Sequence, residues 1–256
     1  MENYRKYQIY THHAKSMKLK TLNKVAKSVC KITVIDTKLK GTGFFLKIKN
    51  PNGKFKFLIT THHVVTKDII DGKKSIEIII NNPNIKQTII LDISRRHILC
   101  LEDKDITAIQ IIQTDILMKN IKCLSYEKTY EYLNYQKYLN KDVFTLHYPK
   151  GEDLECASGK IIKINYPNEF EFQHTIDSDF GSSGSPILLF EDENNKAKVI
   201  GIHTSYNILN KNNKGIFIGE LIKKYFITKN IYIHKLIVPK NSIVRIHNGV
   251  CLFLGK

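Results

Sequence analysis

The segment Gly181-Ser182-Ser183-Gly184-Ser185-Pro186 decides the fold, because a glycine-flanked serine turn of this kind opens directly into a β-like run. Glycine on both sides of the serine pair favours a tight turn, since glycine adopts positive φ angles without a steric cost. Such a turn presents a hydroxyl group ahead of the strand expected over residues 186–190. Taken alone, the segment is compatible with any serine hydrolase, and only residues elsewhere in the chain narrow the choice.

Two upstream segments supply the groups that a serine nucleophile requires. Residues 57–65, Phe-Leu-Ile-Thr-Thr-His-His-Val-Val, form an apolar strand that runs into two histidines. Residues 105–111, Asp-Ile-Thr-Ala-Ile-Gln-Ile, place an acidic residue at the mouth of another apolar strand. A serine hydroxyl needs a base as it attacks a carbonyl, imidazole suits that task, and a carboxylate fixes the imidazole tautomer. The chain order of these groups is therefore His, Asp, Ser.

The base and the acid each have competitors in the sequence. His62 and His63 are adjacent, so they are expected to point to opposite faces of a strand and only one of them faces the site. Asp92 and Asp103 compete with Asp105. A strand-edge position followed by alternating apolar residues favours Asp105.

The serine turn and the remaining histidines also allow alternatives. Ser182 and Ser185 are expected to be loop hydroxyls, because the flanking glycines present Ser183. The histidines expected to be surface or structural residues are His12, His13, His97, His147 and His174.

The composition indicates a globular chain. The 256 residues are 42% hydrophobic and 25% charged, enough for one large domain or two smaller ones. No apolar run approaches the ~20 residues of a membrane span, and the basic N-terminus lacks a signal peptide, so we expect an intracellular protein. The cysteines are odd in number and lack C-x-x-C spacing, which favours reduced thiols and no metal site. They are Cys30, Cys100, Cys123, Cys156 and Cys251.

The formal net charge of +16 allows two interpretations. Forty Lys and Arg against 24 Asp and Glu would attract nucleic acid or an anionic surface. A compositional bias towards Lys, Ile and Asn would give the same number without a partner. In the sequence the lysines are spread along the chain rather than gathered in blocks.

Short β-like runs ended by Gly, Pro, Asn or Asp dominate the chain, which indicates a β-sandwich or β-barrel. They cover residues 29–36, 43–49, 55–60, 75–81, 88–93, 105–112, 142–148, 158–164, 169–176, 186–190 and 198–203. Helices are expected over residues 17–27 and 220–226. Residues 126–140 are rich in Tyr and Lys without period-two alternation, and they are expected to connect two β units.

The segments together resemble the trypsin-like peptidase superfamily, especially members without zymogen activation such as HtrA-type, glutamyl endopeptidase-like and viral enzymes. The family's His, Asp and Ser motifs are similar to residues 59–65, 105–111 and 181–186. Further similarities are Gly41-Thr42-Gly43-Phe44-Phe45, Tyr148-Pro149-Lys150-Gly151 and Val199-Ile200-Gly201-Ile202-His203. The likeness spans about residues 29–222.

The resemblance implies an all-β fold of two six-stranded antiparallel β-barrels, with short N-terminal and C-terminal helices and the site in the cleft between the barrels. It implies a serine endopeptidase that acts on polypeptides through an acyl-enzyme, with no cofactor and no metal. It carries over His63 as base, Asp105 as the residue that orients it, and Ser183 as nucleophile. Gly181 and Ser183 would donate their N–H groups to an oxyanion hole.

The same likeness sets the expected domain organisation. Residues 1–28 would be a basic arm and helix, and residues 29–125 an N-terminal barrel that contains His63 and Asp105. Residues 126–141 would be a linker. Residues 142–229 would form a C-terminal barrel with Ser183 and end in a helix, and residues 230–256 an extension whose strands lie at 231–233 and 236–238. The sequence makes no prediction of oligomeric state.

The expected substrate pocket has two opposing indications. His203 lies on the strand after the serine loop, where relatives that prefer Glu or Gln place a histidine, and Ser178 matches a Ser or Thr that assists it. Asp177 lies six residues before the nucleophile, where trypsin has the aspartate of its pocket for basic residues. The Gly-Ile-His pattern favours an acidic or Gln residue at P1. Thr204 completes the expected pocket, and Tyr206 replaces the small residue that relatives usually have there.

One departure from the family concerns activation. Trypsin-like zymogens carry Asp immediately before the nucleophile, and this Asp pairs with a newly cut N-terminus. Ser182 occupies that place, and the chain has no Ile-Val-Gly-Gly N-terminus. We therefore expect the active fold to form without proteolytic trimming.

A second hypothesis comes from a different functional class. The basic charge is compatible with a protease-fold module that binds nucleic acid or belongs to a virion, with weak or no catalysis. The intact His-Asp-Ser set argues against it. An esterase of the α/β-hydrolase type is disfavoured by the chain order and by the lack of a βα pattern.

Overall fold

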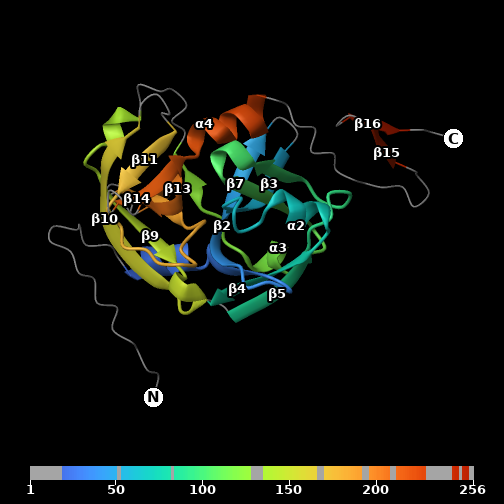
Figure 1. The fold of residues 1–256 in the computed structure, drawn as a ribbon, viewed down its shortest axis with the longest axis horizontal. Helices are drawn as coiled ribbons and strands as arrows, with labels where there is room; N and C mark the ends of the chain where they lie inside the picture. The colour runs from blue at the N-terminus through green and yellow to red at the C-terminus, as the bar shows by residue number, and fades with distance from the viewer. Residues whose placement is uncertain are drawn as a thin grey trace, which may run out of the picture.

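The protein is described by a computed structural model that places residues 19–50, 53–81, 84–127, 135–165, 170–191, 196–207, 212–228, 244–247 and 250–253. Two β-sheets, each curled around its own apolar core, form the two halves of the molecule (Figure 1). None of the described helices is long and apolar enough to cross a membrane.

The first sheet contains seven described strands and is antiparallel throughout. Their order across the sheet is β5-β4-β1-β2-β3-β7-β6. The strands are β1 (Val29–Val34), β2 (Lys40–Asn50), β3 (Gly53–Thr60), β4 (Ser75–Asn81), β5 (Asn84–Ile90), β6 (Ile98–Leu101) and β7 (Ile106–Ile111). Two short helices lie between them, α2 (Lys67–Asp71) and η1 (Glu102–Lys104), and α3 (Leu117–Asn120) follows β7. No described ladder joins β5 to β6, so this sheet curls without closing by hydrogen bonds.

The second sheet closes on itself. Strands β12-β9-β10-β11-β14-β13 form an antiparallel ring, because β12 also pairs with β13, and the short strand β8 adds to β13 in parallel. The strands are β8 (Ser125–Tyr126), β9 (Asp142–His147), β10 (Glu155–Ile164), β11 (Glu171–His174), β12 (Pro186–Glu191), β13 (Lys196–Asn207) and β14 (Asn212–Phe217). The 3-10 turns η3 (Gln136–Tyr138) and η4 (Pro149–Gly151) flank β9.

Three clusters of buried apolar side chains stabilise the two sheets and their contact. One lies inside the first sheet around Ile32 and Leu58, and one inside the second around Phe172 and Phe217. The third joins them, and it includes Phe57 of the first sheet and Leu188 of the second. Helix α1 (Leu19–Ala26), helix α4 (Gly219–Ile222) and the π-helical turn η6 (Lys223–Thr228) contribute side chains to this shared cluster. The relative position of the sheets is therefore fixed by burial of apolar surface between them.

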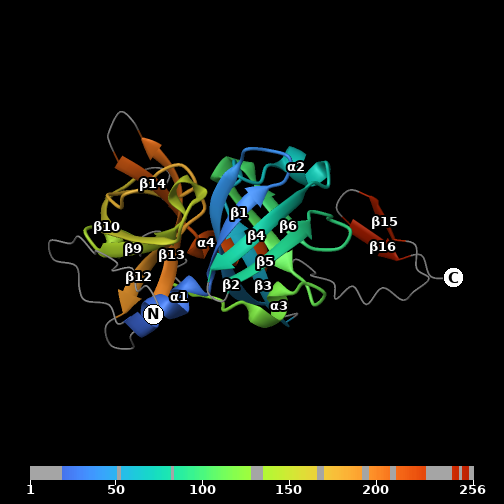
Figure 2. The ribbon, with the colours of Figure 1, turned by 90° about the horizontal axis from the view of Figure 1, so that it is seen from below.

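The expected all-β architecture is confirmed, with helices near both ends of the described core. The structure adds strands β6, β8 and β14, which the sequence patterns did not predict, and ends the strand expected at residues 88–93 at Ile90. The strands expected at residues 231–233 and 236–238 lie outside the described residues. A separate hairpin is formed by β15 (Val244–His247) and β16 (Val250–Phe253), with no described pairing to either large sheet (Figure 2).

The division into residues 1–28, 29–125, 126–141, 142–229 and 230–256 stays a prediction. The two large sheets follow its order along the chain. One pairing does not follow the predicted boundary. Strand β8, at the end of the expected first barrel, pairs with β13 of the second sheet.

A buried ion pair fixes the chain around α3 in the first half. The Arg96 guanidinium donates two hydrogen bonds to Asp115, with Nη1–Oδ2 at 2.9 Å and Nη2–Oδ1 at 3.2 Å. The two side chains are only 7% and 6% exposed. The N–H of Ile112 also donates to Asp115 Oδ2. Removing one partner would leave the other charge buried without compensation.

We predict that Asp115→Ala lowers the free energy of unfolding by about 3–5 kcal/mol, because it leaves the Arg96 charge buried without its ion-pair partner. Urea unfolding measures the difference from the native chain. The matched control is Glu77→Ala, which removes the more exposed Lys86–Glu77 pair and is expected to cost about 1 kcal/mol or less. Equal losses of unfolding free energy in the two variants would contradict the greater effect expected for the buried Arg96–Asp115 pair.

Candidate active site

Thr42 of β2 connects the first sheet to the serine loop of the second. Its N–H donates to the carbonyl of Ser183 at 2.8 Å, and its hydroxyl donates to the carbonyl of Gly181 at 2.7 Å. The same hydroxyl accepts the N–H of Tyr148 at 3.0 Å. The Thr42 carbonyl accepts the hydroxyl of Thr60 at 2.9 Å. Thr42 is fully buried, so these bonds are shielded from water and fix the loop against the first sheet.

Two glycines allow the serine loop to take its shape. Gly181 and Gly184 have φ angles of +86° and +90°, a region that side chains rarely adopt. A side chain at Gly184 would also collide with the carbonyl of Thr42. The glycine requirement inferred from the sequence therefore has two causes, backbone conformation and the close approach of the first sheet.

The structure brings His63 and Asp105 together. His63 Nδ1 lies 2.9 Å from Asp105 Oδ2 and 3.1 Å from Oδ1, and the His63 N–H donates to Oδ1 at 2.9 Å. Asp105 has a φ of 47°, a left-handed conformation at the end of η1 that turns its carboxylate towards the histidine. The two side chains are 48% and 29% exposed, so the pair lies at the surface of the molecule.

The competing residues lie elsewhere. His62 Nε2 accepts the N–H of Lys67 at the start of α2. Asp92 accepts hydrogen bonds from Ser94, which lower the pKa of its carboxyl group. Asp103 pairs with its neighbour Lys104 at 3.7 Å. Among these alternatives, only His63 and Asp105 contact each other.

Ser183 lies close to this pair without a hydrogen bond to it. Its hydroxyl donates to the carbonyl of Thr204 at 3.4 Å. A side chain at Gly41 would meet Val64, next to His63, on one side and the Ser183 carbonyl on the other. Gly41 therefore lies between these two segments, where a side chain would not fit without a shift of Val64.

Two backbone donors of the serine loop have no acceptor among the described residues. The N–H groups of Gly181 and Ser183 form no hydrogen bond there, whereas those of Ser182, Gly184 and Ser185 all do. The carbonyl of Phe180 accepts the N–H of Lys150 and is thereby turned away from these donors. The loop therefore presents two unused N–H groups beside the half-buried Ser183, which is the pattern that binds an oxyanion.

The loop is braced from behind by a histidine that was expected to be merely surface or structural. His147 Nδ1 lies 2.8 Å from Ser182 Oγ, and the same hydroxyl accepts the N–H of Asp179 at 3.1 Å. Ser182 is completely buried and His147 is 3% exposed. Burial lowers the pKa of His147 to about 4, although Asp177 acts in the opposite direction. The position before Ser183 is thus held by neutral hydrogen bonds.

His203 and His174 form a second buried pair. His203 Nδ1 lies 3.2 Å from His174 Nε2, and the N–H of Ile176 donates to His174 Nδ1 at 3.3 Å. This bond makes His174 Nδ1 an acceptor, so its Nε2 carries the proton and donates to His203 Nδ1. The proton of His203 then sits on Nε2. Burial lowers the pKa of His174 to about 4 and that of His203 well below its usual value.

Of the other predicted pocket residues, Ser178 contacts strand β14 and Thr204 contacts Ser183. Ser178 donates its hydroxyl to Asn213, a buried residue of β14 that sequence patterns did not single out, and Asn213 donates to the carbonyl of Ile176. The carbonyl of Thr204 receives the Ser183 hydroxyl, and Tyr206 is 52% exposed.

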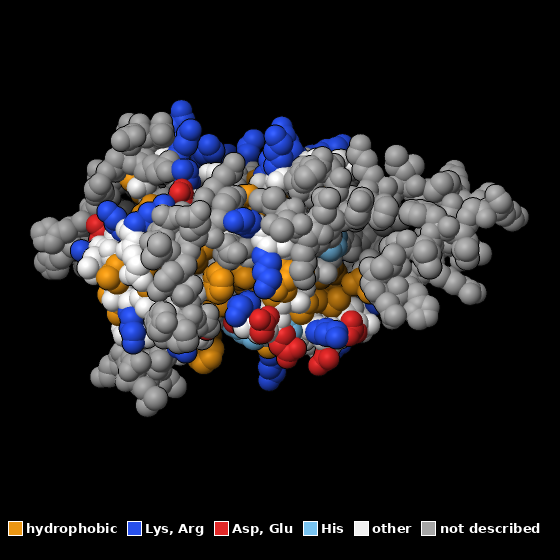
Figure 3. Space-filling model, turned by 90° about the horizontal axis from the view of Figure 1, so that it is seen from above, with side chains coloured by type: hydrophobic (Ala, Val, Ile, Leu, Met, Phe, Trp, Pro, Cys, Tyr) orange, Lys and Arg blue, Asp and Glu red, His pale blue; other side chains and the backbone are white. Residues whose placement is uncertain are grey.

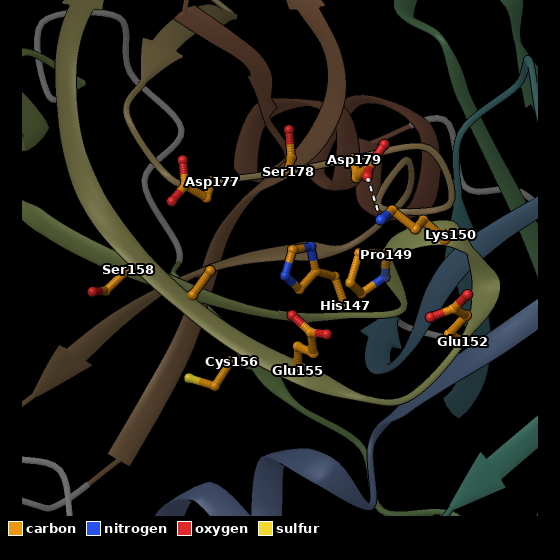
Figure 4. A pocket seen from close by; sticks show the side chains of 11 residues that line it. His147, Pro149, Lys150, Glu152, Glu155, Cys156, Ser158, Asp177, Ser178 and Asp179 are labelled. Atoms are coloured by element: carbon orange, nitrogen blue, oxygen red, sulfur yellow. Dashed lines mark ion pairs between the residues drawn. The ribbon is translucent and has the colours of Figure 1, made fainter. Parts of the chain in front are cut away.

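A cavity of about 450 Å³ lies behind the serine loop, between η4, β10 and the chain before Gly181. It is lined by His147, Pro149, Lys150, Glu152, Glu155, Cys156, Ala157, Ser158, Asp177, Ser178 and Asp179 (Figure 4). Lys150 and Asp179 form an ion pair at its rim. Asp177 shares this cavity with His147, and its charge raises the pKa of His147 against the larger effect of burial.

The described residues contain no cluster of His, Cys, Asp and Glu with the arrangement of a metal site. The described cysteines Cys30, Cys100, Cys123 and Cys156 are free thiols. Burial raises the pKa of Cys156 to about 11, which leaves this thiol protonated and unreactive near neutral pH.

No protein-family model matches the chain, and no curated protein matches it by sequence. Solved structures resemble it in shape. An inactive form of Rv3671c from M. tuberculosis H37Rv superposes with a TM-score of 0.54 at 15% identity, covering 84% of this chain and 93% of that one. The serine protease domain of the Sesbania mosaic virus polyprotein gives 0.52 at 19% identity, covering 78% and 92%.

The tobacco etch virus protease in complex with product gives a TM-score of 0.54 at 11% identity, covering 86% of this chain and 87% of that one. Identities this low show a shared fold. The chain therefore has the chymotrypsin-like two-barrel fold.

The buried histidines predict how stability depends on pH. In the fold their neutral forms are favoured, whereas unfolded histidine takes up a proton near pH 6.5. Between about pH 6.5 and pH 4 the unfolded state binds more protons, so the free energy of unfolding falls as the pH drops through this window. His147 and His174 each contribute a loss on the order of 3 kcal/mol.

Urea unfolding across this pH window measures the slope. In His147→Gln one titrating group is absent. The free energy of unfolding therefore falls less steeply with decreasing pH, by the equivalent of up to one bound proton. An unchanged slope in this variant would show that His147 already titrates normally in the fold.

Proposed function

We propose that the protein is a serine endopeptidase in which Ser183 is the nucleophile, His63 the general base and Asp105 the residue that orients His63. The observation that supports this most directly is the His63–Asp105 hydrogen bond, formed beside a serine loop with two unused N–H groups. Structural neighbours with the same fold are proteases, which favours a peptidase over other uses of the site.

The geometry supports a stepwise mechanism. Asp105 accepts the Nδ1 proton of His63, which leaves Nε2 free to accept a proton from the serine hydroxyl. The hydroxyl must first leave the Thr204 carbonyl, a weak contact at 3.4 Å, and turn towards His63. Attack on the peptide carbonyl then forms an oxyanion, and the N–H groups of Gly181 and Ser183 are placed to stabilise it. His63 returns the proton to the leaving amine, and water hydrolyses the acyl-enzyme.

We propose that the site forms without proteolytic activation. In place of a charged Asp that requires a new N-terminus, the chain has Ser182, whose hydroxyl is already satisfied by His147 and by the N–H of Asp179. Both bonds arise within the second barrel. No ion pair with a terminal amine is therefore needed to hold the loop.

We propose a preference for Glu or Gln at P1. With Nδ1 of His203 facing His174, the Nε2 proton of His203 can donate to a carboxylate or amide oxygen of a substrate. The competing indication for Lys or Arg is weakened, because the charge of Asp177 acts on the pKa of His147, whereas the charges that act on the pKa of the buried His203 are those of other histidines. Ser178 and Thr204 are the further proposed pocket residues, and Asn213 holds the hydroxyl of Ser178.

The second candidate function is a basic protease-fold module with weak or no catalysis. The net charge of +16 favours it, and the formed His63–Asp105 pair opposes it. Fluorophosphonate labelling separates the two, since only an activated serine reacts.

We predict that Ser183→Ala abolishes fluorophosphonate labelling and peptide cleavage without changing the unfolding transition. Asp105→Asn is expected to lower kcat by about 10⁴, because the amide no longer fixes the reactive tautomer of His63. Asp103→Asn is the matched control, since this exposed carboxylate contacts only Lys104, and it should retain full activity. If the native chain were neither labelled nor active, the endopeptidase proposal would be wrong.

We predict that a peptide library is cleaved mainly after Glu or Gln. His203→Leu is expected to lower kcat/KM for these peptides by about 10- to 100-fold, because it removes the hydrogen bond to the P1 side chain. Asp177→Asn is the control and should leave the preference unchanged. Cleavage mainly after Lys or Arg, lost in Asp177→Asn, would reverse the assignment.

A further inference from the structure

The hairpin formed by β2 and β3 places lysine opposite lysine. The strand register pairs Lys47 with Lys56 and Lys49 with Lys54. These residues alternate with Ile48, which is 1% exposed, so the lysines share the other face of the hairpin, on which the buried Phe45 and Leu58 lie further along the strands. Like charges directly across an antiparallel pair destabilise a sheet. Two such pairs in succession are an energetic cost that the apolar core of the hairpin must offset.

Neighbouring segments extend this charge. The N–H of Lys122 donates to the carbonyl of Lys27, which joins the end of α1 to the chain after α3. The next residue, Cys123, lies close enough to Lys47 and Lys56 for both to act on its pKa. We call the surface made by Lys27, Lys47, Lys49, Lys54, Lys56 and Lys122 the basic face.

The basic face lacks carboxylates to neutralise it. Between Leu19 and Thr66 the sequence contains one acidic residue, Asp36, and residues 116–126 contain none. Asp36 lies before β2, at the opposite end of that strand from the paired residues Asn50 and Gly53. In the described chain no lysine of the basic face forms an ion pair, whereas Lys86, Lys137, Lys150, Lys160 and Lys198 each do.

The figures show the same asymmetry. Helix α1, the ends of β2 and β3, and α3 lie along one edge of the molecule, at the bottom of Figure 2. Viewed from the opposite side, that edge is at the top of Figure 3, and Lys and Arg side chains gather along it. The acidic side chains visible in Figure 3 gather towards the other edge. The folded chain thus collects lysines that are dispersed in the sequence.

We propose that the basic face binds the phosphate backbone of double-stranded nucleic acid, independently of base sequence. A row of unneutralised lysines on a rigid hairpin matches a regular line of phosphates, and binding would relieve the repulsion between the paired lysines. An anionic membrane is the less suitable partner, because interfacial binding also needs exposed apolar side chains. None of the large exposed hydrophobic side chains of the described residues lies on β2 or β3, and the neighbouring segments carry two, Leu19 on α1 and Ile116 before α3.

The test uses the full chain and a short fluorescent DNA duplex of mixed sequence. Lys47→Gln, Lys49→Gln and Lys54→Gln are combined in one variant, which leaves the hydrogen bond from Lys56 to the carbonyl of Met118 intact. Fluorescence anisotropy over a range of salt concentrations gives the affinity and its salt dependence. The slope of log K against log salt is expected to fall by about one for each lysine removed, so by about three.

The control variant combines Lys38→Gln, Lys74→Gln and Lys163→Gln, which changes the net charge equally at exposed sites away from the basic face. It should keep most of the native salt slope. The hairpin variant should also unfold at a higher temperature than the native chain at low salt, because the cross-strand repulsion is relieved. Peptidase activity, which the proposal does not involve, should be the same in both variants.

Three outcomes would overturn the proposal. Equal loss of affinity in the two variants would show a non-specific effect of net charge. No measurable binding of the duplex by the native chain would exclude nucleic acid as the partner. Hairpin-dependent binding to vesicles with anionic lipid, without binding to the duplex, would make the surface a membrane contact.

Discussion

The position of the serine loop depends on one residue, Thr42. Its peptide and hydroxyl groups bond to Ser183, Gly181 and Tyr148, so the loop of the second barrel is fixed by a strand of the first. The His63–Asp105 pair belongs to that first sheet. The shared apolar cluster holds the two sheets together, and the hydrogen bonds of Thr42 place the serine loop against the half of the molecule that carries His63 and Asp105.

Neutral, buried hydrogen bonds organise the second barrel around the loop. His147 holds Ser182 from behind, and His174 sets the tautomer of His203. Both arrangements require uncharged imidazole, and burial supplies that condition. The same burial that makes the proposed pocket selective also makes the fold sensitive to acid. In the proposed enzyme, the loop shape and the pocket donor are thus maintained by the interior of the barrel rather than by surface charge.

The lysines on the two halves of the molecule have different surroundings. Four lysines on the second half pair with carboxylates, such as Lys160 with Asp142 and Lys198 with Glu127, which limits their long-range effect. Lysines on β2 and β3 face one another instead, on a hairpin whose other side is fully used in the core. The sheet tolerates this repulsion because Phe57, Leu46 and their neighbours are deeply buried, and apolar burial outweighs repulsion between exposed charges.

The sequence by itself determined the β-rich fold, the order of His63, Asp105 and Ser183, and the need for glycine at 181 and 184, because each rests on local periodicity or local backbone conformation. Strands β6, β8 and β14 were missed, since they are short and are specified by their partners rather than by their own pattern. His147, His174 and Asn213 carry no motif, and only long-range pairing brings them to the loop and the pocket. The gathering of lysines on one face was likewise decided by the tertiary structure, because antiparallel register places residues together that the chain keeps apart.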